Sequence, residues 1–190
     1  PLLTRFQVEY PRIELKIFMT DDNVALLERQ IDIALRFAPT PQGNVHAAKL
    51  LSPQYYCVGS AEWQHKISAP ADLEGADCLL LDLPPALTKW HLNHERTGEK
   101  CTIRAKGHLS LSAPLALLKA AQLGHGPTLL PDWLAKSSIE AGTLVNLLPE
   151  WQGQIRDDAT HLWLLHHPHR HMPLNIRIVK DFLIDQISAL

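Results

Sequence analysis

Apolar and charged residues alternate over 13–18, and a short apolar run over 32–36 ends on Arg36. Alternation at period two predicts a β-strand with one buried face, and the second run is typical of a buried strand. Apolar spacing over 22–29 predicts a helix between them. We therefore predict a strand–helix–strand unit of an α/β sheet, in which ligands bind beyond the carboxyl ends of the strands.

Helical spacing of apolar residues is clearest over 112–123 and 173–187. Ser112, an early proline and Gly124 are typical start and stop signals for the first of these helices. A further helix is predicted over 131–142, and 90–95 is predicted to be a short amphipathic element. Further strands are predicted over 55–60, 78–81, 102–105, 107–111, 128–130 and 161–166. Such alternation of strands and helices favours α/β sheets with right-handed crossovers.

The composition is that of an ordinary globular protein, with 190 residues, 46% hydrophobic and 20% charged. This length allows one large domain or two small lobes. No apolar run approaches the roughly 20 residues that cross a bilayer, so we expect no membrane contact. The first residues lack the layout of a signal peptide. Three cysteines without metal-site spacing suit reduced thiols, so we expect a cytoplasmic protein.

The net charge of −2 bears on whether this chain itself binds nucleic acids. A DNA-binding surface normally shows a stripe of lysine and arginine that neutralises phosphates. The linear sequence contains no basic cluster longer than two or three residues. If the protein acts on DNA, we expect the contact to come from a part of the molecule outside this chain.

Three motifs, in this order and spacing, carry a resemblance to a known family. They are Phe6-x-x-x-Tyr10-Pro11-x-Ile13-x-Leu15, then Asp32-Ile33-Ala34-Leu35-Arg36, then Leu115-x-x-Leu118-x-x-Ala121-x-x-Gly124-x-Gly126 followed by Leu130-Pro131. Together they resemble the effector-binding domain of LysR-type transcriptional regulators, over nearly the whole chain.

The resemblance implies an α/β fold of two Rossmann-like lobes joined by two crossover strands, as in type II periplasmic binding proteins. It places lobe I at 1–57 and 155–190 and lobe II at 58–154. In this family a central strand of lobe I precedes the first helix. We therefore expect that strand, and a winged helix-turn-helix domain, upstream of Pro1.

Arg36 is the first candidate for effector binding, because a guanidinium at a strand end can grip a carboxylate bidentately. An ion pair with a neighbouring acid, or exposure to solvent, would explain it equally well. Thr20 and Asp21 follow the other predicted strand toward the same edge. Capping the next helix is an alternative role for both.

Ser110 and Ser112 precede the helix predicted over 112–123, whose first amides attract anions. A plain N-cap role for Ser112 is an alternative and does not exclude the first. Gly126 and Thr128 open the next strand, near where the lobes are expected to face each other. Pro127 departs from the small aliphatic residue usual in the family and removes one backbone donor.

The histidine-rich run 166–171 invites a metal assignment, since histidine is a common zinc or nickel ligand. Adjacent side chains of an extended segment point apart, and similar turns precede the last helix of the resembled family. We therefore predict no metal and no cofactor. No catalytic motif is present, and we expect no enzyme activity.

We predict a regulatory domain that binds a small effector, a carboxylate in particular, between two lobes and changes their relative angle. It is expected to form a dimer or tetramer and to reach DNA only through the absent N-terminal domain. Two alternatives stay open. One is a periplasmic-type solute-binding protein, and the other is a small α/β enzyme with a nucleophile among its three cysteines.

Overall fold

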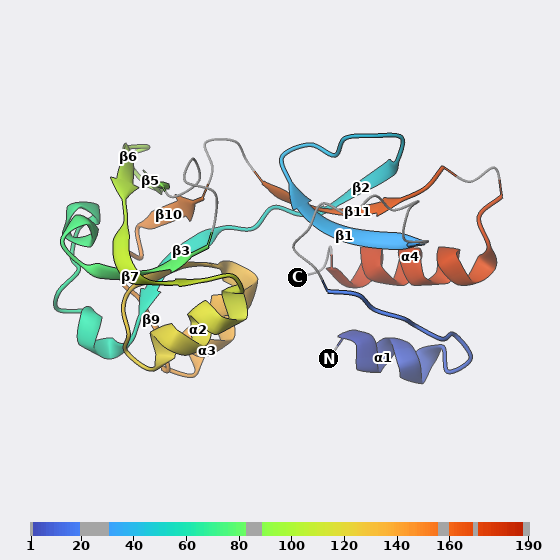
Figure 1. Cartoon of the computed structure of the whole chain (residues 1–190), viewed down its shortest axis with the longest axis horizontal. Helices are drawn as coiled ribbons and strands as arrows, with labels where there is room; N and C mark the ends of the chain where they lie inside the picture. Colours follow the sequence, from blue (N-terminus) through green and yellow to red (C-terminus); the bar gives the residue numbers. More distant parts are fainter. Residues whose placement is uncertain (1, 20–30, 83–88, 156–159, 169–170, 188–190) are drawn as a thin grey trace. The chain divides into compact units, whose positions relative to one another are not determined.

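The computed structural model describes residues 2–19, 31–82, 89–155, 160–168 and 171–187 (Figure 1). The chain forms two compact units. Unit 1 comprises Pro1–Ser52 and Thr160–Leu190, and unit 2 comprises Pro53–Ala159. The chain therefore passes between units about five residues away from the lobe boundaries expected at 57/58 and 154/155. Tyr55 and Tyr56 belong to unit 2 because they pair with its strand β8.

Unit 1 contains a three-stranded sheet and two helices. Its elements are α1 (Leu2–Glu9), β1 (Ile33–Ala38), β2 (His46–Leu51), β11 (His161–His166) and α4 (Leu174–Ile187). The strand order is β1-β11-β2, and both ladders are antiparallel. Leu164, Leu50 and Ile187 share its core, so α4 packs on the sheet.

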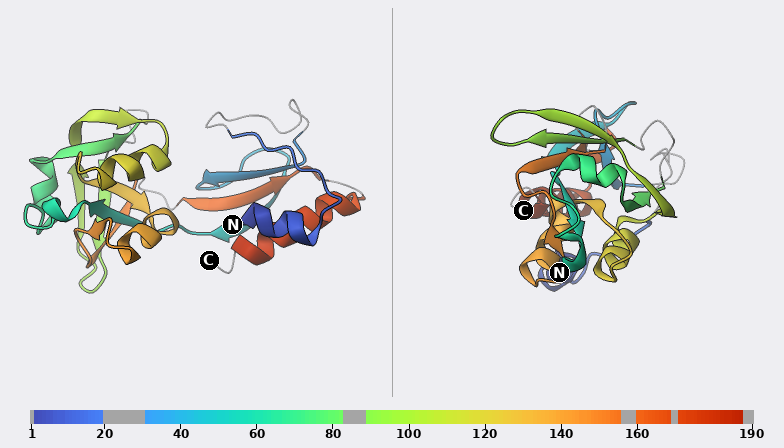
Figure 2. Two further views of the ribbon diagram at one scale, coloured as in Figure 1. Left: turned by 90° about the horizontal axis from the view of Figure 1, so that it is seen from below. Right: turned by 90° about the vertical axis from the view of Figure 1, so that its left-hand side faces the viewer.

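The helix α1 lies beside α4 in both views (Figures 1 and 2). The ring of Phe6 meets that of Phe182 edge to face, with ring centres 5.0 Å apart. Phe6 is the buried residue of α1, whereas Val8 on the same helix is 79% exposed. Phe6, together with the partly buried Leu2 on the unit 1 core, thus anchors a helix whose other side chains are exposed.

The strand predicted over 13–18 is wrong, because residues 13–19 form no ladder with any strand that the structure describes. Ile17 and Phe18 are 57% and 61% exposed. An alternating pattern becomes a strand only where a neighbouring strand supplies backbone partners. The helix predicted over 22–29 lies outside the described residues.

Unit 2 holds most of the strands. Its elements are β3 (Tyr55–Gly59), β4 (Asp77–Leu81), β5 (Lys89–His94), β6 (Lys100–Arg104), β7 (Lys106–Leu111), α2 (Pro114–Gln122), β8 (Thr128–Pro131), α3 (Asp132–Glu140), β9 (Val145–Asn146) and β10 (Trp151–Gln154), with 3₁₀ turns η1 (Ala61–Trp63) and η2 (Pro70–Glu74). The main sheet has the order β6-β5-β10-β3-β8, with β9 also paired to β3. A second ladder joins β4 and β7.

The directions in which neighbouring strands pair differ from the prediction. The alternation of strands and helices favoured right-handed crossovers, which join parallel strands. The ladders of the main sheet are antiparallel, and β4 with β7 forms the parallel pair of the described structure. The mixed α/β architecture was predicted correctly, but direction depends on long-range pairing that local periodicity does not encode.

Two cores lie on opposite sides of the strands of unit 2. Cys57, Cys78 and Leu129 belong to one core, while their chain neighbours Val58, Leu79 and Leu130 belong to the other. Because successive side chains of a strand point to opposite faces, β3, β4 and β8 are buried on both sides.

No helix within the described ranges has the length and apolar character needed to cross a bilayer.

Candidate functional site

The parallel pair of β4 and β7 places several predicted residues at one edge of unit 2. Ser110 pairs with Leu80, and Leu111 pairs with Leu81. The amide of Asp82 donates to the carbonyl of Leu111 at 2.9 Å, which holds the two strand ends together. Carboxyl ends of parallel strands share an edge, so the chain leaves β7 toward α2 there. Ser110 and Ser112 are both exposed at this edge.

The helix α2 begins at Pro114, one residue later than the predicted N-cap requires. Its N-cap is Ala113, whose backbone is extended (φ −117°, ψ 127°) and whose side chain makes no capping hydrogen bond. The prediction of Ser112 as N-cap is therefore wrong. Proline has a φ suited to the first helical position, which shifts the cap to the residue before Pro114. The helix start thus keeps its partial positive charge without a side-chain cap.

Gly126 and Thr128 lie in the interior, where the approach to β8 crosses β4. A Cβ added at Gly126 would lie 2.3 Å from the carbonyl oxygen of Asp77. The hydroxyl of Thr128, which is 1% exposed, donates to the carbonyl of Leu79 at 2.9 Å. The carbonyl of Pro127 accepts from the amide of Leu79 at 2.8 Å. These residues join β8 to β4, and their contact with an effector stays a prediction.

Arg36 lies inside β1 and not at its end, contrary to expectation. The strand continues through Phe37 to Ala38, because those residues extend the antiparallel ladder with β11. Arg36 is directly opposite Trp163 and is half-buried. It belongs to unit 1, whereas Ser110 and Ser112 belong to unit 2. That they contact one ligand stays a prediction. Thr20 and Asp21 lie outside the described residues.

The histidine-rich run begins in β11. The imidazole Nδ1 of His166 donates to the carbonyl of His167 at 2.7 Å, and the ring of His166 lies 5.3 Å from that of His46. In the described ranges, no three side chains of His, Cys, Asp or Glu gather as a metal site would require. The members of the run at 169 and 170 lie outside those ranges.

The three cysteines are poor nucleophiles in this structure. Burial raises the pKa of Cys78 to about 12, and its thiol donates to the carbonyl of Leu73 at 3.5 Å. Burial also raises the pKa of Cys57 strongly, and burial followed by Glu99 raises that of the partly buried Cys101. Because the thiolate is the reactive form, the structure offers no support for a cysteine-dependent enzyme.

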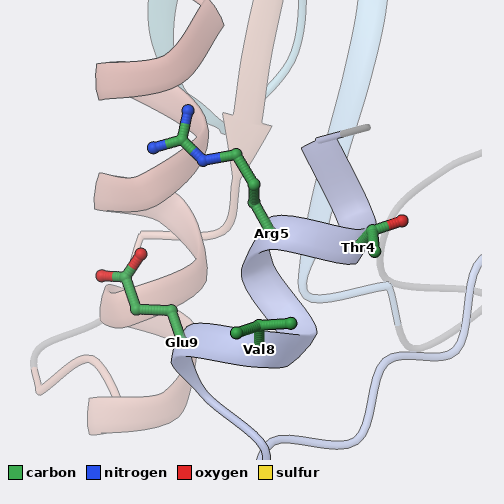
Figure 3. A pocket seen from close by; sticks show the side chains of 4 residues that line it. All are labelled: Thr4, Arg5, Val8 and Glu9. Atoms are coloured by element: carbon green, nitrogen blue, oxygen red, sulfur yellow. The ribbon is translucent and has the colours of Figure 1, made fainter.

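A surface hollow of about 540 Å³ lies beside α1 (Figure 3). Its described lining residues are Thr4, Arg5, Val8 and Glu9. All four come from a single helix and, as Figure 3 shows, are spread along its length. Binding sites for small molecules usually enclose the ligand with polar groups from several elements. We therefore assign no effector to this hollow.

Comparison with known proteins identifies the family. The model of the LysR substrate binding domain matches residues 1–188. The chain therefore belongs to this family, whose members are regulatory, effector-binding domains of LysR-type transcriptional regulators. The prediction of the family and of its periplasmic-binding-protein-like fold is confirmed.

Similar proteins agree with this assignment. The chain is 28% identical to the probable HTH-type transcriptional regulator LtrA of Klebsiella pneumoniae, over 100% of this chain and 62% of that protein. It is 27% identical to the HTH-type transcriptional regulator CrgA of Neisseria meningitidis serogroup C, over 99% and 62%. The chain thus spans about 62% of these relatives' length.

Solved structures show the same likeness. The regulatory domain of CrgA from Neisseria meningitidis matches with a TM-score of 0.81 and 26% identity, over 98% of this chain and 90% of that one. The full-length Vibrio cholerae virulence activator AphB matches with a TM-score of 0.81 and 25% identity, over 98% and 62%. Nothing in these comparisons supports the alternative of a periplasmic solute-binding protein.

Proposed function

We propose that this domain senses a small metabolite carrying a carboxylate and thereby controls the DNA binding of a larger regulator. The observation that carries the proposal is the uncapped start of α2 beside two exposed serine hydroxyls, Ser110 and Ser112. Amides at a helix start favour negative charge, and hydroxyl donors add directional hydrogen bonds. Within unit 2, this edge offers what a carboxylate needs.

Unit 1 contributes the cation in this proposal. The half-buried guanidinium of Arg36 has the geometry to bind a carboxylate bidentately, and Thr20 and Asp21, which lie outside the described residues, are kept as further candidates. Gly126 and Thr128 are kept as candidate effector contacts, and the same two residues fix the contact of β8 with β4.

Such an effector changes the regulator by shifting an equilibrium between two arrangements of the units. It shifts that equilibrium only by the difference between its affinities for the two states. In a cytoplasmic dimer or tetramer, the shift alters the spacing of the DNA-binding domains. No catalysis is involved.

A thermal-shift screen of small carboxylates tests the proposal, because a ligand bound only by the native state raises Tm by mass action. Arg36→Ala and Ser112→Ala are each expected to weaken the apparent affinity for any hit at least tenfold, and so to reduce the thermal shift that the hit produces. Arg177→Ala is the matched control, since it removes an exposed arginine of α4 elsewhere on unit 1. An undiminished shift in Arg36→Ala removes Arg36 from the site.

A further inference from the structure

Three neighbouring strands of unit 2, β6, β5 and β10, present one polar face to solvent. Their inward side chains, such as Trp90, Leu92 and Ile103, are buried in the core. The side chains of alternate positions face the other way, because residues directly opposite in a ladder share a face. We call the outward set the polar sheet face. It consists of Lys89, His91, Asn93, Lys100, Thr102, Arg104, Gln152 and Gln154.

The eight residues include three cations and no anion, although one carboxylate reaches the edge of the face. Lys89, Lys100 and Arg104 are exposed cations. No acidic residue occupies any of the eight positions. Within the described part of the chain, none of these three cations forms an ion pair. Glu95, which directly follows β5, brings a carboxylate to the edge of the face by accepting a hydrogen bond from Gln152 at 2.7 Å.

One cross-strand pair on the face is electrostatically unfavourable by itself. Lys89 lies directly opposite Arg104, and like charges in that position repel. Cations on the edge strand β6 would protect the sheet from edge-to-edge association. That role does not explain Lys89, because β5 lies between β6 and β10 and is not an edge. A bound anion would offset the repulsion.

We propose that the polar sheet face contacts the phosphate backbone of duplex DNA. Phosphates are contacted mainly by lysine and arginine together with threonine, asparagine and glutamine, which is the composition of this face. Protein interfaces, in contrast, are enriched in aromatic residues and depleted in lysine. None of the large exposed hydrophobic residues of the described structure lies on β5, β6 or β10. The face therefore suits phosphates better than a protein partner.

Folding creates this surface from cations that are never adjacent in the sequence. Lys100 and Arg104 are separated by three other residues, and Lys89 comes from another strand. The sequence therefore shows no basic stripe, and the proposal departs from the expectation that DNA contacts come only from outside this chain. A chain with net charge −2 can still attract DNA locally.

Fluorescence anisotropy of the 190-residue chain with a labelled mixed-sequence duplex at low ionic strength tests the proposal. The wild-type chain is expected to bind, with an affinity that falls as salt is raised. The triple variant Lys89→Gln/Lys100→Gln/Arg104→Gln is expected to bind at least about tenfold more weakly. The plot of log affinity against log salt has a negative slope, and the magnitude of this slope is expected to be smaller in the triple variant than in the wild type by about two to three. The reason is that each neutralised phosphate contributes about 0.9.

The matched control is Lys49→Gln/Lys119→Gln/Lys136→Gln, which removes three exposed lysines on β2, α2 and α3. It has the same net charge as the face variant and is expected to bind DNA like the wild type. Equal loss in both variants, or no binding by the wild-type chain, overturns the proposal. So does binding of poly-glutamate in preference to DNA, which would indicate an acidic protein partner. Arg104→Gln alone repeats the test if the triple variant does not fold.

Discussion

At the scale of single residues, the close approach of β4 to β7 leaves no room for a side chain at Gly107. A Cβ at this position would lie 1.7 Å from the carbonyl oxygen of Cys78 and 2.8 Å from its carbonyl carbon. Both obstructing atoms are backbone, so a larger residue must push the two strands apart. The glycine is required by this contact and not by an unusual φ.

We expect Gly107→Ala to lower the free energy of unfolding by about 3 kcal/mol or more, because overpacking a ladder forces backbone movement. Urea unfolding followed by circular dichroism measures the change. Gly75→Ala is the control, since a Cβ there would meet the nearest backbone oxygen, that of Asp72, at an ordinary 3.8 Å. Equal stability of the two variants would show that β4 and β7 lie further apart than described.

Burial of Cys78 predicts a decline of stability in alkali. Its folded-state pKa of about 12 lies above the ordinary value of 9.0, so the folded state holds the proton more tightly. This contribution is complete below pH 9 and is lost as pH rises toward 12. The unfolding free energy should therefore fall in this range by up to about 1.4 kcal/mol per pH unit for this group.

Urea unfolding between pH 8 and about 11 checks this prediction. Cys78→Ala should show a shallower decline than the wild type, although the smaller side chain lowers stability at every pH. Cys101→Ala is the comparison, because that thiol is only partly buried and should change the slope less. Parallel curves for Cys78→Ala and the wild type would show that Cys78 does not contribute to the pH dependence.

At the scale of elements, the start of α2 connects helix stability to effector binding. The N-cap residue Ala113 has no oxygen with which to accept a hydrogen bond from the first turn. We expect Ala113→Ser to raise the free energy of unfolding by about 0.5–2 kcal/mol, because serine caps a helix well. Ser112→Ala should leave the stability nearly unchanged, since Ser112 precedes the cap.

The variant Ala113→Asp separates stability from binding. An aspartate should also stabilise α2, but its charge would occupy the helix start that we propose for the effector carboxylate. The expected result is a higher Tm without ligand and a weaker thermal shift with a carboxylate hit. A thermal shift equal to that of the wild type would place the effector elsewhere.

Local patterns predicted those elements whose burial follows a simple period. The strand β11 and the helix α4 were predicted because their apolar residues recur regularly. The strands β2 and β10 were not predicted, since the residues His46–Leu51 and Trp151–Gln154 show no clean alternation. The strand predicted over 13–18 failed for the opposite reason, as its pattern is regular but no described strand pairs with it.

The candidate site was only partly predictable for a related reason. Ser110 and Ser112 were placed at the start of α2 because local start signals located that helix to within two residues. The interior position of Arg36 depends on how far the ladder with β11 extends, which is a long-range property. The polar sheet face could not be predicted from the sequence, because its residues come from three strands that long-range pairing brings together.

At the scale of the whole molecule, the two units differ in how the chain builds them. Unit 2 is one continuous segment, Pro53–Ala159, whereas unit 1 needs two segments from opposite ends of the sequence. Each core also belongs to one unit. The two cores of unit 2 are built from residues between Tyr55 and Trp151, and the third core uses residues of unit 1 alone.

This organisation predicts that residues 53–159 fold without the rest of the chain, because every strand and core of unit 2 is encoded within them. Expressed alone, this segment should unfold cooperatively in urea and show dispersed amide signals by NMR. Residues 1–52 alone should stay unfolded, since β1 and β2 pair with each other only through β11. A disordered 53–159 segment would mean that unit 2 depends on unit 1 for its stability. If the segment folds but gives no thermal shift with a carboxylate hit, groups of unit 1 such as Arg36 are needed for binding.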